Sequence, residues 1–268
     1  MMSTVENLDV LDGLDRVADS SIDLIIADPP YGIRKSFGQR DSYDGLAEWR
    51  AWCQRWLAQC FRVLDPSGSI LLYGIHNFIC YNQVQLFDLG MRYRRQIIWH
   101  YDNGFCGNRG IRATYEPILW FSKTDECFFR EIREPYKSAD RLRYPIKKNG
   151  KVWQPNPAGR LAGDVWEIPT LAGRRFADER VDHPTQKPLA LSERLVEHFS
   201  PPAGRILIPF AGSGSECVAA HRLGRQFTAF EINADYVKLA ERRLTGEGWR
   251  PDGKVGRSRG KVANPAAV

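Results

Sequence analysis

The sequence predicts an α/β fold built on a doubly wound, mainly parallel β-sheet. Three observations lead to this prediction. Apolar, strand-like runs alternate with amphipathic helical runs, which is typical of parallel sheets. A glycine-rich turn over 209–215 joins a strand-like run to a helical run late in the chain. A basic stretch over 130–181 has little hydrophobic period and interrupts the alternation, so it is expected to be an insertion.

The first half of the chain begins with a buried strand and an amphipathic helix. Residues 22–27 are almost continuously apolar, as expected of a buried strand. From 46 to 64, three tryptophans, two cysteines and a leucine recur at spacings of three and four, which predicts a helix whose stripe packs in the core rather than against a ligand. The other elements expected here are a turn over 65–68, a strand over 69–73, a helix over 77–89, strands over 93–101 and 114–121, and an exposed polar loop over 102–112.

The second half returns to the alternating pattern after the basic stretch. The expected elements are a helix over 189–199, a turn over 200–204, a strand over 205–208, a helix over 216–223, a strand over 225–230 and a helix over 235–244. Because these are successive strand–helix units, both strands are expected to join the same parallel sheet.

Asp28-Pro29-Pro30-Tyr31 follows the first buried strand directly. Open α/β sheets hold their ligands at the carboxyl ends of strands. The prolines stiffen the turn, because each fixes φ and removes a backbone donor, and they leave the Asp28 carboxylate and the Pro29 carbonyl as acceptors for an amino group. The Tyr31 ring offers a face on which a nucleobase would stack. The plainer alternative is a turn that only blocks continuation of the strand.

The glycine-rich turn Pro209–Ser215 has the context of a nucleotide-type cofactor site. Glycine lets the backbone approach a ligand, and the N-terminus of the following helix is electropositive. Glu231 ends the next strand, roughly 20 residues later, where an acidic side chain accepts hydrogen bonds from ribose hydroxyls. The chain therefore contains one half-site for an amino-bearing base and one for a ribonucleoside.

Asp28–Tyr31 and Phe210–Gly214 resemble the two signature motifs of the S-adenosylmethionine-dependent DNA amino-methyltransferases. Their order, with the catalytic motif first, is similar to that of the permuted beta class. Further segments that carry the resemblance lie at 7–9, 115–119, 163–166 and 183–188. The resemblance implies a seven-stranded Rossmann-like methyltransferase sheet with an inserted target-recognition region. It also implies methyl transfer from S-adenosylmethionine to N6 of an adenine flipped out of double-stranded DNA.

The same resemblance assigns roles to residues of this chain. The catalytic residues it implies are Asp28, Pro29, Pro30 and Tyr31. The cofactor-binding residues it implies are Asp9, Val10, Asp28, Thr185, Lys187, Phe210, Ala211, Gly212, Ser213, Gly214, Glu231 and Ile232. Within this set, Asp9 is matched to the cofactor's adenine amino group and Glu231 to its ribose. Thr185 and Lys187 are matched to its methionine carboxylate. Plainer roles stay open, with Asp9 as a helix cap, Lys187 as a surface charge and Phe210 as a core residue.

The basic stretch is the expected DNA-contacting part. Lysines and arginines interleaved with tyrosines and a tryptophan suit phosphate neutralisation and base contact, although a solvated loop would have a similar composition. The residues expected to contact DNA are Arg141, Arg143, Lys147 and Lys148. The implied division of the chain is a catalytic part over 1–129, a target-recognition insertion over 130–181, a cofactor-binding part over 182–245, and a disordered basic tail over 246–268.

Ile208 departs from the family pattern. The glycine motif is usually preceded by Asp-Pro-Phe, whereas this chain has Ile208-Pro209-Phe210. A polar contact from that position is lost, so an active enzyme with weaker cofactor binding is expected.

Rival functions stay open at this stage. An N4-cytosine methyltransferase would use the same chemistry, but its motif more often begins with Ser, so Asp28 favours adenine. Methylation of RNA or of a protein glutamine would more often show Asn at that position. A noncatalytic DNA-binding module would keep the basic stretch, and a nicotinamide-dependent oxidoreductase would leave Asp28–Tyr31 unexplained.

Composition agrees with these expectations. The chain has 268 residues, a formal charge of +6 and a pI near 9.0, which suits a polyanionic partner. Its six cysteines form no C-x-x-C pair, so neither a zinc site nor a disulfide framework is expected, and no metal is called for. No signal peptide or long apolar span is evident, so a cytoplasmic protein without membrane attachment is expected. A monomer and a homodimer both stay open, and a standalone modifier is favoured over one paired with an endonuclease.

Overall fold

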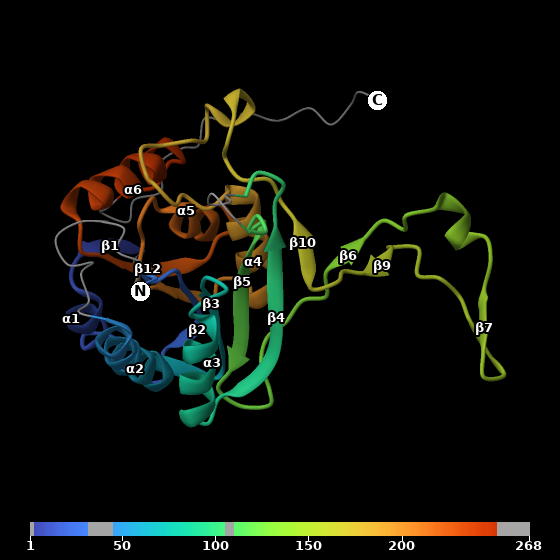
Figure 1. The fold of residues 1–268 in the computed structure, drawn as a ribbon, viewed down its shortest axis with the longest axis horizontal. Helices are drawn as coiled ribbons and strands as arrows, with labels where there is room; N and C mark the ends of the chain where they lie inside the picture. The colour runs from blue at the N-terminus through green and yellow to red at the C-terminus, as the bar shows by residue number, and fades with distance from the viewer. Residues whose placement is uncertain (1–2, 32–44, 105–109, 251–268) are drawn as a thin grey trace.

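The computed structural model describes residues 3–31, 45–104 and 110–250, which form a layered α/β body and a projecting arm (Figure 1). Most of the predicted basic tail and the middle of the predicted polar loop lie outside the described residues. The strands are β1 (Thr4–Asn7), β2 (Ile22–Ala27), β3 (Leu64–Tyr73), β4 (Arg92–His100), β5 (Tyr115–Ser122), β6 (Arg133–Glu134), β7 (Ile146–Lys148), β8 (Lys151–Trp153), β9 (Arg160–Leu161), β10 (Val165–Glu167), β11 (Arg205–Ile208) and β12 (Gln226–Glu231). The α-helices are α1 (Val10–Leu14), α2 (Leu46–Val63), α3 (Ile79–Asp88), α4 (Leu189–Phe199), α5 (Ser215–Arg222) and α6 (Ala234–Gly246), and two 3-10 helices span Ala139–Leu142 and Arg174–Phe176.

The described residues form one main sheet with the strand order β1-β12-β11-β2-β3-β5-β4-β10. Neighbouring strands are parallel except around β5, which is antiparallel to both β3 and β4. From β2 the chain proceeds to β3 on one side, and later to β11 and β12 on the other. The carboxyl ends of β2 and β11 therefore flank the point where strand order reverses, which is where open sheets bind ligands.

The α/β class and the mainly parallel sheet are confirmed, but the described part of the sheet has eight strands rather than the predicted seven. The strand β10 lies inside the predicted insertion and pairs parallel with β4. It is only three residues long, and only its central residue, Trp166, is buried. A pattern this short carries no usable period, so β10 could not be predicted from the residues alone.

The segment 65–68 was expected to be a turn, whereas β3 runs through it from Leu64. The pairing with β2 shifts at this point, because Ile22 faces Leu64 while Leu24 faces Ser69. Asp65 still forms a local turn contact, since its carboxylate accepts from the backbone N–H of Ser67 at 2.9 Å. The predicted turn chemistry is thus present, as a bulge within a longer strand.

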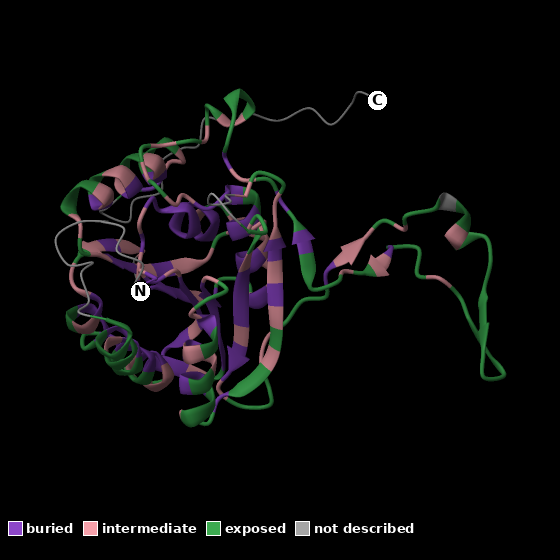
Figure 2. Cartoon of the chain, viewed as in Figure 1, coloured by how far each residue is buried: buried purple, intermediate pink, exposed green. Residues whose placement is uncertain are grey.

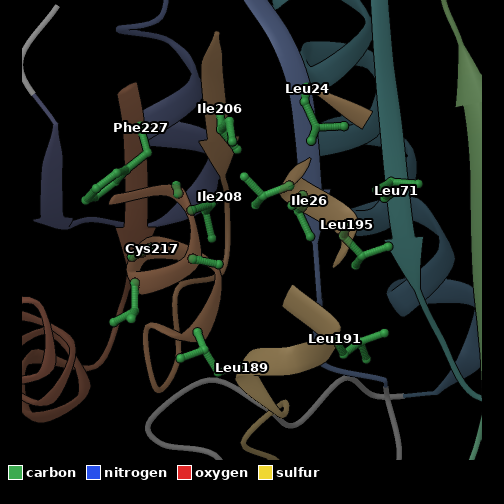
Figure 3. Packing of buried hydrophobic residues seen from close by; sticks show 14 of the residues in the cluster. Leu24, Ile26, Leu71, Leu189, Leu191, Leu195, Ile206, Ile208, Cys217 and Phe227 are labelled. Carbon is green, nitrogen blue, oxygen red and sulfur yellow. The ribbon is translucent and has the colours of Figure 1, made fainter. Parts of the chain in front are cut away.

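Alternate side chains of the central strands pack into two separate core layers. On β2, Leu24 and Ile26 belong to the layer beneath α4, α5 and α6, and Ile25 belongs to the layer that contains α1, α2 and α3. Figure 3 shows the first layer, in which Leu191 and Leu195 of α4 approach the sheet. Helices on both faces explain why β2 reads as a continuous apolar run.

Residues 133–161 form an arm that leaves the body beyond β10 (Figure 1). The strands β6 and β9 pair at its base, and β7 and β8 pair as a distal hairpin whose residues are all exposed (Figure 2). Ile132 and Trp166, just outside its two ends, are buried in the body. Both ends of the arm are therefore fixed to the main core. None of the helices in the described ranges has the length and apolar character needed to cross a bilayer.

Candidate active site

A cavity of about 560 Å³ lies at the carboxyl ends of β2, β11 and β12. The predicted site residues that line it are Asp9, Val10, Asp28, Pro29, Pro30, Tyr31, Thr185, Lys187, Phe210, Ala211, Gly212, Ser213, Glu231 and Ile232. This convergence follows from strand order, because β11 pairs directly with β2 and Leu207 faces Ile25. The segment Asp28–Tyr31 after β2, here called the acidic corner, and the glycine turn after β11 are consequently neighbours.

Lys187 connects the acidic corner to the rest of the body. Its side chain is 4% exposed, and its Nζ lies 2.8 Å from Asp28 Oδ2 and 3.2 Å from Glu116 Oε2. Burial alone lowers the pKa of Lys187, but the two carboxylates outweigh this effect, so the net pKa is raised and the side chain stays charged. Lys187 was expected beside the cofactor's methionine carboxylate. In the structure its ammonium contacts Asp28 and Glu116, and the residue also lines the cavity.

Tyr31 also contacts Asp28 rather than presenting an open ring face. Its hydroxyl donates a hydrogen bond to Asp28 Oδ1, and the residue is 8% exposed. Burial, together with the nearby Asp28 and Glu116 carboxylates, raises the pKa of Tyr31 well above its usual value, so the phenol stays protonated. Both oxygens of Asp28 thus have donors, one from Tyr31 and one from Lys187.

The glycine turn is held in shape by Glu231. One carboxylate oxygen accepts from the backbone N–H of Gly212 at 2.8 Å, and the other accepts from that of Asn233 at 2.8 Å. Gly212 has φ +49°, and a side chain there would begin 3.0 Å from Nε2 of His183. Gly214 is absent from the cavity wall and instead caps α5 in a left-handed conformation. Glycine is therefore required here both by backbone conformation and by close packing.

Asp9 and Phe210 have both the expected and the plainer roles. Asp9 caps α1 by accepting from the Leu11 N–H at 2.9 Å, and it also lines the cavity. Phe210 lines the cavity while its ring packs against Trp52 and Trp56, with centroids 5.7 and 5.2 Å away. Trp56 is fully buried, as the tryptophan stripe predicted, but Trp52 forms part of the cavity wall.

Several lining residues were not identified from the sequence, namely Leu8, Leu11, Asp12, Glu48, Trp52, Arg55, His183, Pro209, Glu216, Phe230 and Tyr236. His183 lies in the 183–188 segment, and its ring packs edge-on against Tyr236 at 4.5 Å. Burial lowers the pKa of His183 to about 4, so the imidazole is neutral near pH 7. Glu116, which pairs with Lys187, was given no role from the sequence. The signal that could have identified it is an acidic residue within the mostly apolar strand β5.

Ile208 and Glu216 lie on either side of the glycine turn. Ile208 is 1% exposed and packs in the core layer beneath α4 and α5 (Figure 3). Glu216, the second residue of α5, is 6% exposed and lines the cavity. The apolar side chain of Ile208 therefore packs in the core. The Glu216 carboxyl group lines the cavity from the other side of the glycine turn.

The predicted DNA-contacting residues are not in the cavity. Arg141 and Arg143 lie near the first 3-10 helix of the arm, and Lys147 and Lys148 lie on β7. Arg143, Lys147 and Lys148 are exposed, whereas Arg141 is partly buried, and Arg143 pairs with Asp140 at 2.9 Å. The sequence thus contributes two spatially separate features, a polar cavity and a basic arm. The residues that the structure describes contain no group of three or more His, Cys, Asp or Glu placed to hold a metal ion.

Comparison with known proteins identifies relatives over nearly the whole chain. The N6_N4_Mtase family, described as DNA methylase, matches residues 22–242. The type II methyltransferase M1.MboII of Moraxella bovis is 34% identical over 252 residues, which are 89% of this chain and 95% of that protein. The DNA adenine methyltransferase YhdJ of Escherichia coli K12 is 33% identical over 252 residues, which are 90% of this chain and 82% of that protein.

Solved structures share the fold. The M1.HpyAVI–SAM complex superposes with a TM-score of 0.61 at 23% identity, covering 91% of this chain and 100% of that one. The cytosine-N4-specific PvuII DNA methyltransferase superposes with a TM-score of 0.69 at 16% identity, covering 91% of this chain and 86% of that one.

Proposed function

The chain belongs to the DNA methylase family of N6 and N4 amino-methyltransferases, and from this premise we propose that it methylates N6 of adenine in DNA. S-adenosylmethionine is the cofactor. The observation that carries the proposal is the single cavity in which Asp28 and the glycine turn meet at the tips of neighbouring parallel strands. Methyl transfer needs an amine and a methyl donor within reach of each other, and this arrangement supplies a seat for each.

The cavity residues fit the cofactor. Gly212 allows close approach of a ligand, since a side chain at that position would fill the space against His183. Glu231 and Asp9 supply carboxylates for hydroxyl and amino groups, and Phe210 and Ile232 supply apolar surface for an adenine ring. We assign Glu231 to the ribose and Asp9 to the adenine end. S-adenosylmethionine brings a methyl group already activated on a sulfonium, so the protein's main task is alignment.

Asp28 acts as the acceptor that aligns and polarises the target amine. The exocyclic nitrogen of adenine is a weak nucleophile because its lone pair is delocalised into the ring. Hydrogen bonds from that nitrogen to Asp28 and to the Pro29 carbonyl would favour a tetrahedral nitrogen and stabilise the positive charge that develops on it. Lys187 Nζ lies 2.8 Å from Asp28 Oδ2, and Asp28 Oδ1, which accepts from Tyr31, has a second lone pair for the amine. The Tyr31 ring is assigned to stacking on the flipped base.

Adenine is favoured over cytosine by the residue that opens the catalytic segment. Asp28 stands where N4-cytosine enzymes more often have Ser. YhdJ, whose name specifies adenine, is 33% identical to this chain. The PvuII enzyme, whose name specifies cytosine, is related at the level of fold. Both bases present an exocyclic amine, so the chemistry of the cavity is the same for either.

The basic arm is proposed to hold DNA. Residues 133–161 contain eight lysines and arginines against two acidic residues. The exposed aromatics Tyr144 and Trp153 lie among them. A positively charged surface of this kind neutralises phosphates, and the aromatic rings can contact bases. Arg141, Arg143, Lys147 and Lys148 are assigned to these contacts.

Methyl transfer from tritiated S-adenosylmethionine to unmethylated DNA of mixed sequence tests the proposal. Wild type should incorporate label, and mass spectrometry of the digested DNA should find N6-methyldeoxyadenosine. Asp28→Ala should lower incorporation by about 100-fold or more, in line with the loss of one aligned transition-state contact. Asp88→Ala, an exposed carboxylate at the end of α3, is the matched control and should behave as wild type.

The outcomes separate the parts of this proposal. Absence of incorporation by wild type would contradict the reaction itself. Equal incorporation by Asp28→Ala and wild type would remove the role of Asp28. Label found in N4-methyldeoxycytidine would overturn the choice of adenine while leaving the reaction class intact.

A further inference from the structure

We propose that the Glu216 carboxylate binds the α-ammonium group of the methionine part of S-adenosylmethionine. This inference rests on the proposed function, because it assigns a residue to the cofactor named there. It concerns a position that neither signature motif includes.

The position of Glu216 is the first support. Glu216 lines the cavity and is 6% exposed. Ser192 on α4 donates from its hydroxyl to Glu216 Oε1 at 3.1 Å, which fixes the direction of the side chain. Within residues 3–31, 45–104 and 110–250, the Glu216 carboxylate forms no ion pair. A buried carboxyl group in a cavity wall, held by the Ser192 hydroxyl and a backbone hydrogen bond, is well placed to accept from a bound cation.

The charge balance around Glu216 is the second support. The ammonium of Lys187 is shared by Asp28 and Glu116. The guanidinium of Arg243 donates to Ser213 O and Ser215 Oγ. Burial raises the pKa of Glu216, and the nearby Asp28 carboxylate adds to this effect. The site thus has an excess of carboxyl groups. S-adenosylmethionine has an ammonium and a sulfonium against one carboxylate, so its net charge is complementary.

The location of Glu216 identifies the group it binds. Ser215, the residue before Glu216, donates to the backbone carbonyl of Lys187 at 2.8 Å, and Lys187 Nζ lies 2.8 Å from Asp28 Oδ2. Glu216 therefore lies on the Asp28 side of the cavity, where the methyl group must be transferred. Glu231, bonded to Gly212 and Asn233, marks the other side of the glycine turn. Ile208 is buried in the core and offers no acceptor. Of these positions, Glu216 is the one that brings a carboxylate to the methionine end.

Calorimetric titration of Glu216→Gln with three ligands tests the proposal. S-adenosylmethionine and S-adenosylhomocysteine both have the α-ammonium, whereas 5′-methylthioadenosine lacks the whole amino-acid part. Loss of a charged hydrogen-bond partner should weaken binding of the first two by roughly 10- to 100-fold. Binding of 5′-methylthioadenosine should change by less than about twofold, because no contact to it is lost. Glu193→Gln on α4, whose side chain is 37% exposed, is the matched control and should bind all three as wild type does.

Four outcomes are decisive. Equal affinity of Glu216→Gln and wild type for S-adenosylmethionine, with or without a lower melting temperature, overturns the assignment and leaves Glu216 a structural role. Weaker binding of S-adenosylmethionine alone indicates a contact to the sulfonium and also overturns it. Equal loss for all three ligands indicates a collapsed cavity and contradicts it as well. Failure of wild type to bind any of them would instead refute the proposed function.

Discussion

At the scale of single residues, a buried cluster joins Lys187 to the carboxylates of Asp28 and Glu116 at the cavity. Asp28, Lys187 and Glu231 were all singled out from motifs, and all line the cavity. The pairing of Lys187 with Asp28 and Glu116 was not predicted, because the three residues come from different parts of the chain and only folding brings them together. The hydrogen bond from Tyr31 to Asp28 was missed for a different reason, because its direction depends on a side-chain rotamer.

Lys187 is expected to stabilise the fold, because its ammonium bridges the Asp28 and Glu116 carboxylates. Lys187→Gln leaves two carboxylates facing one another without a cation. Loss of one partner from a buried ion pair typically lowers the free energy of unfolding by about 3–5 kcal/mol. Because Asp28 and Glu116 are 19% and 22% exposed, the lower end, about 3 kcal/mol, is expected. Urea denaturation measures this loss.

Two further variants separate the buried cluster from an ordinary lysine. Lys238→Gln removes a lysine whose pair with Asp235 is exposed, and it should cost at most about 0.5 kcal/mol. Adding Glu116→Gln to Lys187→Gln should restore part of the loss, because one of the opposed carboxylates is then gone. A loss for Lys187→Gln no larger than that for Lys238→Gln would argue against a stabilising cluster.

At the scale of helices and strands, predictions succeeded where the pattern was long. The strands 22–27 and 205–208 and the helix 189–199 have the predicted bounds. The short strand β10 and the bulge in β3 were missed, because each depends on its pairing partner rather than on local period. The glycine turn was recognised, but the packing that makes Gly214 necessary lies on α6, far away in the sequence.

Gly214→Ala tests the coupling between the glycine turn and α6. Gly214 has φ +77°, and an added Cβ would lie 2.7 Å from Cβ of Ala240. The left-handed backbone costs roughly 1–2 kcal/mol for alanine, and the clash adds to that cost. Gly224→Ala is the matched control, because Gly224 has φ +69° with nothing within 4 Å of an added Cβ.

Urea denaturation should therefore rank the free energy of unfolding as wild type, then Gly224→Ala, then Gly214→Ala. The difference between the two variants isolates the contact with Ala240. An equal loss of unfolding free energy in both variants would mean that α6 shifts at little cost. The conformation of the glycine turn would then not depend on α6.

At the scale of the whole molecule, the sequence predicted the main arrangement, a polar cavity at the switch point and a separate basic insertion. This was possible because strand order in α/β sheets follows a few rules and the motifs mark the strand ends. The extent of the arm was not predictable. The segment 130–181 was expected as one insertion, whereas β10 within it belongs to the main sheet.

The arm is expected to account for much of the salt dependence of DNA binding. Each phosphate contact contributes roughly 0.9 to the slope of log K against log salt concentration. Lys147→Gln combined with Lys148→Gln should therefore reduce the slope by about 1.8. The measurement is fluorescence anisotropy of labelled duplex DNA over a range of salt concentrations. Lys238→Gln combined with Arg242→Gln removes the same charge from α6, and an equal effect of this control would show that the arm has no special role.

The attachment of the arm has a consequence for how this protein can change over time. Glu134 at its base accepts from Arg160 at 2.7 Å and from Arg194 of α4 at 2.8 Å, and Arg194 lies over the Trp166 ring at 4.4 Å. These contacts close the base of the arm without involving any side chain of the cavity wall. The length and contents of the arm can therefore be exchanged without altering the side chains that line the cavity. If the arm contacts DNA as proposed, new sequence preferences can evolve in this way while the reaction chemistry is inherited.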